Sequence, residues 1–197
     1  NSYNIDENEY HEYDEFGLDY GERGKILSYI KDPIYLKYVL RNSSSLHITI
    51  DNFVYTHIIK SINDVNQIKN YIEKTEHYGN YGIAELVISL NEPDYTKKII
   101  EDRDKYDFKG NDITVLVISL NEPDYTKKII EDRDKNDLDG YSITELVKTL
   151  HEPEYSKRII ENREKYGLNG YNIAGLVESL NEPEYTKKII ENREKYD

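Results

Sequence analysis

Apolar residues along most of this chain recur with the period of an amphipathic helix. Ile143, Leu146, Val147 and Leu150 stand at i, i+3, i+4 and i+7, which places them on one side of a helix. Ser142 precedes this stripe and a glutamate follows three residues later, a capping-box pattern, so we predict that Ser142 is the N-cap. Asp112 and Asn172 occupy the same position in neighbouring segments and are predicted to cap in the same way.

A second helix is predicted after each Asn-Glu-Pro or His-Glu-Pro sequence, because proline is tolerated in a first helical turn but not in a helix interior. Its candidate N-caps are Asn91, Asn121, His151 and Asn181. Its predicted buried residues are Tyr95, Ile99, Ile100 and Tyr106. We expect it to close at Gly110, Gly140 and Gly170, with Phe108, Leu138 and Leu168 plugging the hairpins.

These helix pairs repeat every thirty residues. The sequence LVISLNEPDYTKKIIEDRDK at 86–105 recurs unchanged at 116–135, and close variants occupy 146–165 and 176–195. Weaker copies occur at 26–42 and, with a two-residue shift, at 58–78. The predicted repeats are 23–52, 53–82, 83–112, 113–142, 143–172 and 173–197.

One helix pair cannot cover its own apolar stripe, whereas stacked neighbours can. The sequence therefore predicts an all-α fold, an α-solenoid of about six helix–turn–helix repeats. On the pattern just described, the chain resembles the broad class of short αα-hairpin solenoids that includes tetratricopeptide and HEAT arrays. The tetratricopeptide pattern of Trp, Gly-Tyr and Ala-Phe at a 34-residue period and the ankyrin TPLH signature are both absent. The resemblance implies binding of another protein.

Charge narrows the range of partners. The formal net charge is −13, which disfavours binding to nucleic acid phosphates and to anionic lipid, and favours a protein partner with a basic surface. No run of apolar residues is long enough for a membrane span, so we expect no membrane insertion. We expect a cytoplasmic protein. Heavy use of Asn, Ile, Lys and Tyr suggests an AT-rich gene, and with it a host-directed effector of an intracellular microbe, translocated into the host cytosol.

The sequence offers no specific signal for catalysis. There is no cysteine, which excludes thiol nucleophiles and thiolate metal sites. No two histidines stand at i, i+4, and the chain has neither a phosphate-binding glycine loop nor a nucleophile elbow. We expect a non-enzymatic protein with no catalytic residues, cofactor or metal.

The candidate partner-binding residues are cations that recur on the second helices and just after them. They could form a regularly spaced docking surface, or a solvated helix face held by i, i+4 ion pairs. Two other recurring sets also allow two interpretations. The Asn91 series, which comprises Asn91 and its equivalents every thirty residues, could bind an extended peptide or cap helices. The Tyr95 series, defined in the same way, could anchor a partner or pack in the core with its hydroxyls at the rim. The twelve cations are Lys97, Lys98, Arg103, Lys127, Lys128, Arg133, Lys157, Arg158, Arg163, Lys187, Lys188 and Arg193.

The N-terminal residues 1–22 are acidic and tyrosine-rich, and lie outside the repeat region 23–197. We expect a tail or a cap over the first repeat, or an interaction arm whose aromatic residues enter a basic groove. For the whole chain, the leading hypothesis is a protein–protein interaction scaffold. The alternatives are an accessory or targeting domain of a larger enzyme, and a structural spacer or self-associating array.

Overall fold

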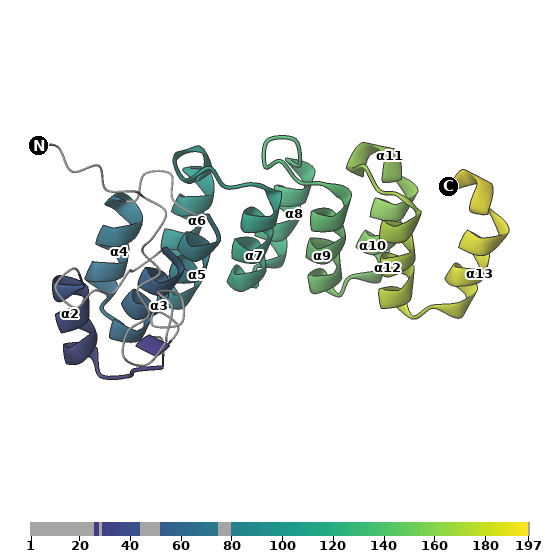
Figure 1. Ribbon diagram of the computed structural model, residues 1–197. Coiled ribbons are helices and arrows are strands. Elements are labelled where there is room, and N and C mark those ends of the chain that lie inside the picture. The colour runs from purple at the N-terminus through teal and green to yellow at the C-terminus, as the bar shows by residue number, and fades with distance from the viewer. Residues whose placement is uncertain (1–25, 28, 44–51, 75–79, 197) are drawn as a thin grey trace, which may run out of the picture. The chain divides into compact units, whose positions relative to one another are not determined.

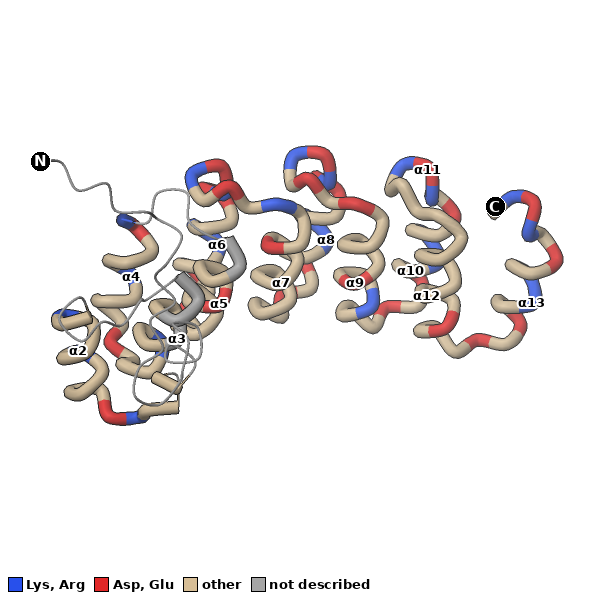
Figure 2. The backbone as a smooth tube through the Cα atoms, in the orientation of Figure 1, with Lys and Arg blue, Asp and Glu red and all other residues tan. Residues whose placement is uncertain are grey.

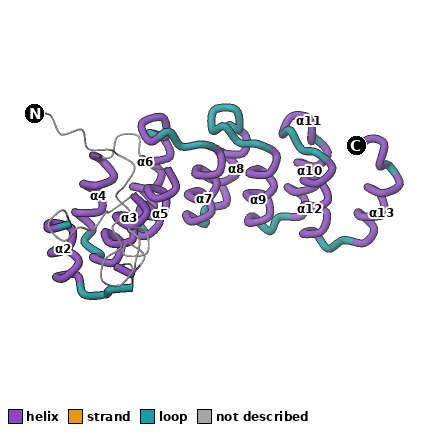
Figure 3. The backbone as a smooth tube through the Cα atoms, in the orientation of Figure 1, coloured by secondary structure: helices purple, strands orange, loops and turns teal. Residues whose placement is uncertain are grey.

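The computed structural model describes residues 26–27, 29–43, 52–74 and 80–196. Among these residues there are twelve α-helices, α2 to α13, joined by turns and short 3-10 segments, and none lies in a β-strand (Figures 1 and 3). The predicted all-α fold is confirmed. The predicted tail or cap at 1–22 lies outside the described residues. No helix in the described ranges is both long and apolar enough to cross a bilayer.

The chain divides into two compact units, Asn1–Lys74 and Thr75–Asp197. In the first unit, α2 packs against α3 and α3 against α4. Its buried cluster contains Leu27, Leu36, Val39, Ile58 and Ile62. The bounds of its helices are α2(Pro33–Asn42), α3(Asn52–Ile62) and α4(Val65–Lys74).

The second unit contains four helix pairs, one for each thirty-residue copy. Within a pair, the first helix is eleven residues long and the second is nine. A short helical turn follows three of the four second helices. The pairs are α5(Asn80–Leu90) with α6(Pro93–Glu101), α7(Gly110–Leu120) with α8(Pro123–Glu131), α9(Gly140–Leu150) with α10(Pro153–Glu161), and α12(Gly170–Leu180) with α13(Pro183–Glu191); the turns are η1(Arg103–Tyr106), α11(Arg163–Tyr166) and η2(Arg193–Lys195).

Successive pairs of the second unit stack in register. The first helices pack on one another, α5 on α7, α7 on α9 and α9 on α12. Each second helix also packs against the first helix of the next pair, α6 on α7, α8 on α9 and α10 on α12. Figure 1 shows the resulting two layers, and the repeated contacts confirm a solenoid arrangement within this unit.

The apolar stripes predicted from the sequence lie in the contacts between these helices. Ile143, Leu146 and Val147 are buried on the first helix of their pair, as are Ile99 and Ile100 on a second helix. The predicted hairpin plugs are confirmed, since Phe108, Leu138 and Leu168 are all buried. Dispersion and the hydrophobic effect therefore act mainly between pairs, so neighbouring pairs depend on one another for stability.

The first helices begin three residues earlier than predicted. Asp139 is the N-cap of α9, and its carboxylate accepts a hydrogen bond from Ser142 N at 2.7 Å. Asn169 caps α12 in the same way, and the side chain of Asn172 accepts a hydrogen bond from Asn169 N at 3.1 Å. The predicted caps Asp112, Ser142 and Asn172 were therefore wrong: these residues sit in the first turn, where Asp112 and Asn172 fill the reciprocal half of a capping box.

The Asn91 series has a different role from the one predicted. These residues end the first helices in the left-handed conformation, with φ between 51° and 52°. Asparagine tolerates this region better than most residues with a side chain, which explains its use here. The prediction that they are N-caps was wrong, because the N-caps of the second helices are the acidic residues that follow, Glu92, Glu122, Glu152 and Glu182.

The glycines also differ from their predicted role. The left-handed residues after the first three second helices are Asp107, Asp137 and Gly167, while Gly110 and Gly140 begin the next first helix. A Cβ on Gly110 would lie 2.2 Å from Asp137 O, and one on Gly140 would lie 2.6 Å from Gly167 O. These positions therefore require glycine because the turn after the second helix of the same pair approaches closely, and not because a helix ends there.

Candidate interaction surface

Charged side chains concentrate on the second helices and on the turns that follow them, whereas the first helices carry few (Figure 2). The predicted partner-binding cations lie on this charged layer. The structure divides them into three series with different surroundings, which we describe by their first members, Lys97, Arg103 and Lys98.

The Lys97 series connects successive helix pairs. Lys97 Nζ lies 2.6 Å from the carboxylate of Glu122, the N-cap of the next second helix. The ammonium is also 5.3 Å from the ring centre of Tyr125, within range of a cation–π interaction. The same contacts recur at Lys127 with Glu152 at 2.7 Å and Tyr155 at 5.4 Å, and at Lys157 with Glu182 at 2.8 Å and Tyr185 at 5.5 Å.

The ion pair of this series also occurs in the first unit. Lys37 Nζ lies 3.5 Å from Asp64, the residue before α4, whose carboxylate caps that helix through Gln67 N. The two-residue shift of this copy places Asp64 at the position of Glu92. We call the Lys–acid contact between successive pairs, with its tyrosine where present, the inter-pair staple. Three of the four Lys97-series residues are engaged in it, which removes them from a free docking surface.

The Tyr95 series packs in the core, as one of the two interpretations predicted. Tyr155 and Tyr185 are buried, and Tyr95 and Tyr125 are half-buried. The expectation that the hydroxyls lie at the rim was wrong, because the hydroxyl oxygens of Tyr155 and Tyr185 are enclosed. Burial raises the pKa of each of these two phenols to about 12, with nearby Glu131 adding to the effect at Tyr155.

Two members of the Arg103 series contact the turn of the next pair. Arg133 Nη1 donates a hydrogen bond to Lys165 O at 3.0 Å, across to the following pair. Arg163 lies with its guanidinium 5.6 Å from the ring centre of Tyr196. Arg103 is the most enclosed of the series, with its side chain 15% exposed. Arg133 and Arg163 therefore stabilise the stacking of turns, and Arg193 is the exposed member of the series.

The Lys98 series remains on the outer face of the second helices. Lys98, Lys128 and Lys188 are exposed, and none of the three makes an ion pair within the described ranges. Arg158, the fourth member, reaches back to Glu131 at 2.9 Å. The outer face also carries exposed acids one turn earlier, at Asp94, Asp124, Glu154 and Glu184. Alternating acid and base on an exposed helix face is the chemistry that remains available to a partner.

Glu131 is the centre of a cluster that the sequence analysis missed. Its carboxylate accepts a hydrogen bond from the Tyr166 hydroxyl at 3.0 Å and pairs with Lys165 at 2.5 Å and with Arg158. The contact with Lys165 contributes most to lowering the pKa of Glu131, and the Tyr166 hydroxyl adds to it. The signal was present in the sequence as acid–base pairs near the thirty-residue spacing, which single-helix patterns such as i, i+4 do not register.

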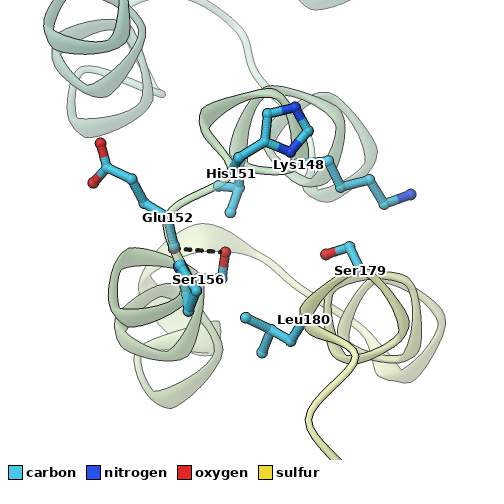
Figure 4. Close-up of a pocket in the computed structure, with 8 residues that line it drawn as sticks. Lys148, His151, Glu152, Ser156, Ser179 and Leu180 are labelled. Atoms are coloured by element: carbon cyan, nitrogen blue, oxygen red, sulfur yellow. Dashed lines mark hydrogen bonds between the residues drawn. The ribbon is translucent and has the colours of Figure 1, made fainter.

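A recess of about 290 Å³ lies where the α9–α10 turn faces α12 (Figure 4). Lys148, His151 and Ser156 stand there in place of Ile118, Asn121 and Thr126 of the preceding pair. The Ser156 hydroxyl donates to Glu152 O at 3.2 Å, and Lys148 Nζ pairs with Glu145 at 3.0 Å. His151 is thus the one polar lining side chain without a hydrogen bond or ion pair in the described part of the chain.

Among the described residues, no three His, Cys, Asp or Glu side chains gather where they could hold a metal ion. No family model, curated protein or solved structure matches the chain.

Proposed function

We propose that this chain is a non-catalytic scaffold that binds another protein along the outer face of α6, α8, α10 and α13. The supporting observation is the division of the cations. Three members of the Lys97 series and two of the Arg103 series contact the next pair, whereas Lys98 and Lys128 are exposed, thirty residues apart and without an ion pair among the described residues. Contacts between pairs account for most of the first two series, whereas Lys98 and Lys128 make no such contact among the described residues.

The spacing of this surface is fixed by the stacked pairs. Each inter-pair staple joins an acidic N-cap to a lysine of the preceding second helix, so neighbouring second helices keep one register. A rigid row of alternating acids and bases suits a protein partner with a complementary charge pattern. The net charge of −13 adds a long-range attraction for a partner that is basic overall.

The test is a triple charge reversal on the outer face, Lys98→Glu, Lys128→Glu and Lys188→Glu. Its matched control is Lys105→Glu, Lys135→Glu and Lys195→Glu, which changes net charge by the same amount on exposed turns. Tagged forms of the unchanged chain and both variants are used to capture proteins from one lysate, with quantification by mass spectrometry. Tm is measured for each.

The proposal is supported if a protein is recovered by the unchanged chain and by the turn control, but is depleted about tenfold or more with the outer-face triple. A tenfold loss is expected because several lost contacts of about 0.5 kcal/mol each add up to that factor. The Tm of the outer-face triple is expected to stay within about 2 °C of the unchanged chain, because its three lysines make no ion pair in the described structure. Equal recovery by all three forms would reject the outer face as the binding surface.

A further inference from the structure

The last helix pair exposes apolar side chains that every earlier pair of the second unit buries. Ile190 is 61% exposed, whereas its counterparts Ile100, Ile130 and Ile160 are at most 1% exposed. The sequence around all four is nearly identical, so the difference comes from packing alone. In the earlier pairs this isoleucine lies on a second helix that packs against the next first helix.

The greater exposure includes other positions on the same side of the last pair. Ala174 is exposed and Thr186 is half-buried, whereas the residues at their positions in the earlier pairs are buried. Together with Val177 and Ile189, they line an apolar hollow of about 500 Å³ that also reaches Tyr196. We call the surface formed by Ala174, Val177, Thr186, Ile189 and Ile190 the open face.

The charged rim of the open face also lacks the partners that its counterparts have. Lys187 is exposed and makes no ion pair in the described part of the chain, although Lys97, Lys127 and Lys157 each bind an acidic N-cap and lie over a tyrosine. Those partners lie 25 and 28 residues further on in the sequence. The contacts of its counterparts therefore indicate which groups would pair with Lys187: a carboxylate at a helix N-terminus and a tyrosine one turn later.

We propose that the open face is a docking site for a further helix pair of this repeat's own type. The argument is continuity with an existing interface: the same face is covered three times within the second unit, by α7, α9 and α12, and each time the incoming pair supplies the staple acid and tyrosine. The occupant carries an apolar stripe on its first helix and an acid–Pro–acid–Tyr sequence at the start of its second helix. This site is separate from the proposed outer binding face.

The test extends the chain. A second copy of residues 168–197 fused directly after residue 197 keeps the thirty-residue register, so its counterparts of Glu182 and Tyr185 reach Lys187. We expect one cooperative melting transition, with Tm raised by several degrees because a nearest-neighbour interface is added. A control extension carries alanine at the appended counterparts of Glu182 and Tyr185, and is expected to give a smaller rise in Tm.

Ile190→Lys, made in both the original and the extended chain, shows whether the open face is the surface that is used. In the original chain, Tm is expected to change by less than about 2 °C, because the side chain is already largely in water. In the extended chain, the substitution is expected to remove most of the gain. An equal effect in both chains, or a separate low-temperature transition for the appended copy, would overturn the proposal.

A second copy of the chain is the other possible occupant, and sedimentation of the original chain over a range of concentrations detects it. We expect a constant mass. A mass that rises with concentration, and returns to that of one chain with Ile190→Lys, would place a second copy on the open face and overturn the choice of occupant.

Discussion

Lys127 Nζ lies 2.7 Å from Glu152 Oε1, and the two residues belong to successive helix pairs. Glu152 is the N-cap of α10 but makes no side-chain hydrogen bond to its own helix. Its carboxylate therefore serves the preceding pair, while its position at a helix N-terminus favours its negative charge. The repeated Glu-Pro sequence thus starts a helix and joins neighbouring pairs.

Removing the staple lysines should lower stability more than removing their neighbours. We expect Lys97→Ala with Lys127→Ala to lower Tm by about 2–4 °C, since two partly enclosed contacts of about 0.5 kcal/mol each are lost. The matched control, Lys98→Ala with Lys128→Ala, should change Tm by less than about 1 °C, since neither side chain makes an ion pair in the described residues. Thermal melts followed by circular dichroism at 222 nm measure both. Equal losses would remove the distinction between the two series.

The glycines that begin the first helices should differ sharply in their tolerance of alanine. Gly110→Ala places a Cβ 2.2 Å from Asp137 O, and we expect a loss of about 1–3 kcal/mol in the free energy of unfolding. At Gly170 the nearest atom to a new Cβ is Tyr196 O at 3.8 Å, an ordinary contact. Gly170→Ala should therefore be neutral or stabilise by about 0.5 kcal/mol. Urea unfolding of both variants measures the difference, and similar losses would contradict the close-approach explanation.

Asn136 occupies the position that Tyr106 and Tyr166 fill in neighbouring pairs. It is buried, and its amide donates to Ile129 O at 3.2 Å and Asp132 O at 3.0 Å. Asn136→Tyr would exchange these bonds for a buried ring and a hydroxyl placed to reach Glu101, as Tyr166 reaches Glu131.

A buried ring contributes about 1.5–3 kcal/mol and the new hydroxyl bond to Glu101 about 1 kcal/mol, whereas two lost hydrogen bonds cost about 1 kcal/mol each. We therefore expect Asn136→Tyr to raise Tm by about 2 °C. Asn136→Phe is the control that keeps the ring and omits the hydroxyl, and its Tm should lie below that of the tyrosine variant. A fall in Tm with Asn136→Tyr would show that this pair does not accept the ring that its neighbours bury.

Alkaline pH should weaken the second unit through its buried phenols. The pKa of Tyr155 and of Tyr185 is about 12 in the folded chain, above the ordinary value of 10. The folded state therefore favours the protonated phenols, so this contribution is complete below pH 10 and is lost as the pH rises from 10 to 12. Tm should fall across that window, and less so in Tyr155→Phe with Tyr185→Phe. An unchanged slope in the double variant would refute this assignment.

The thirty-residue period and the apolar stripes were enough to predict an all-α array of helix pairs. Burial of Leu146, Ile99 and Phe108 followed the sequence pattern because each has neighbours of the same kind at fixed spacing. Helix ends were harder to predict. Asn91 and Gly110 each lie between two predicted helices. Each residue could end the preceding helix or begin the next one, and composition alone did not show which.

The sequence by itself determined that successive copies are equivalent, and therefore that whatever joins one pair to the next must recur. Only the tertiary structure decided which charges do the joining, because Lys97 and Lys98 are adjacent and identical in type, and differ only in the side of α6 from which they project. The same holds for Ile160 and Ile190, which share one sequence context and differ only in whether a helix lies against them. Burial and pairing depend on neighbours across space, and a local pattern of residues does not contain that information.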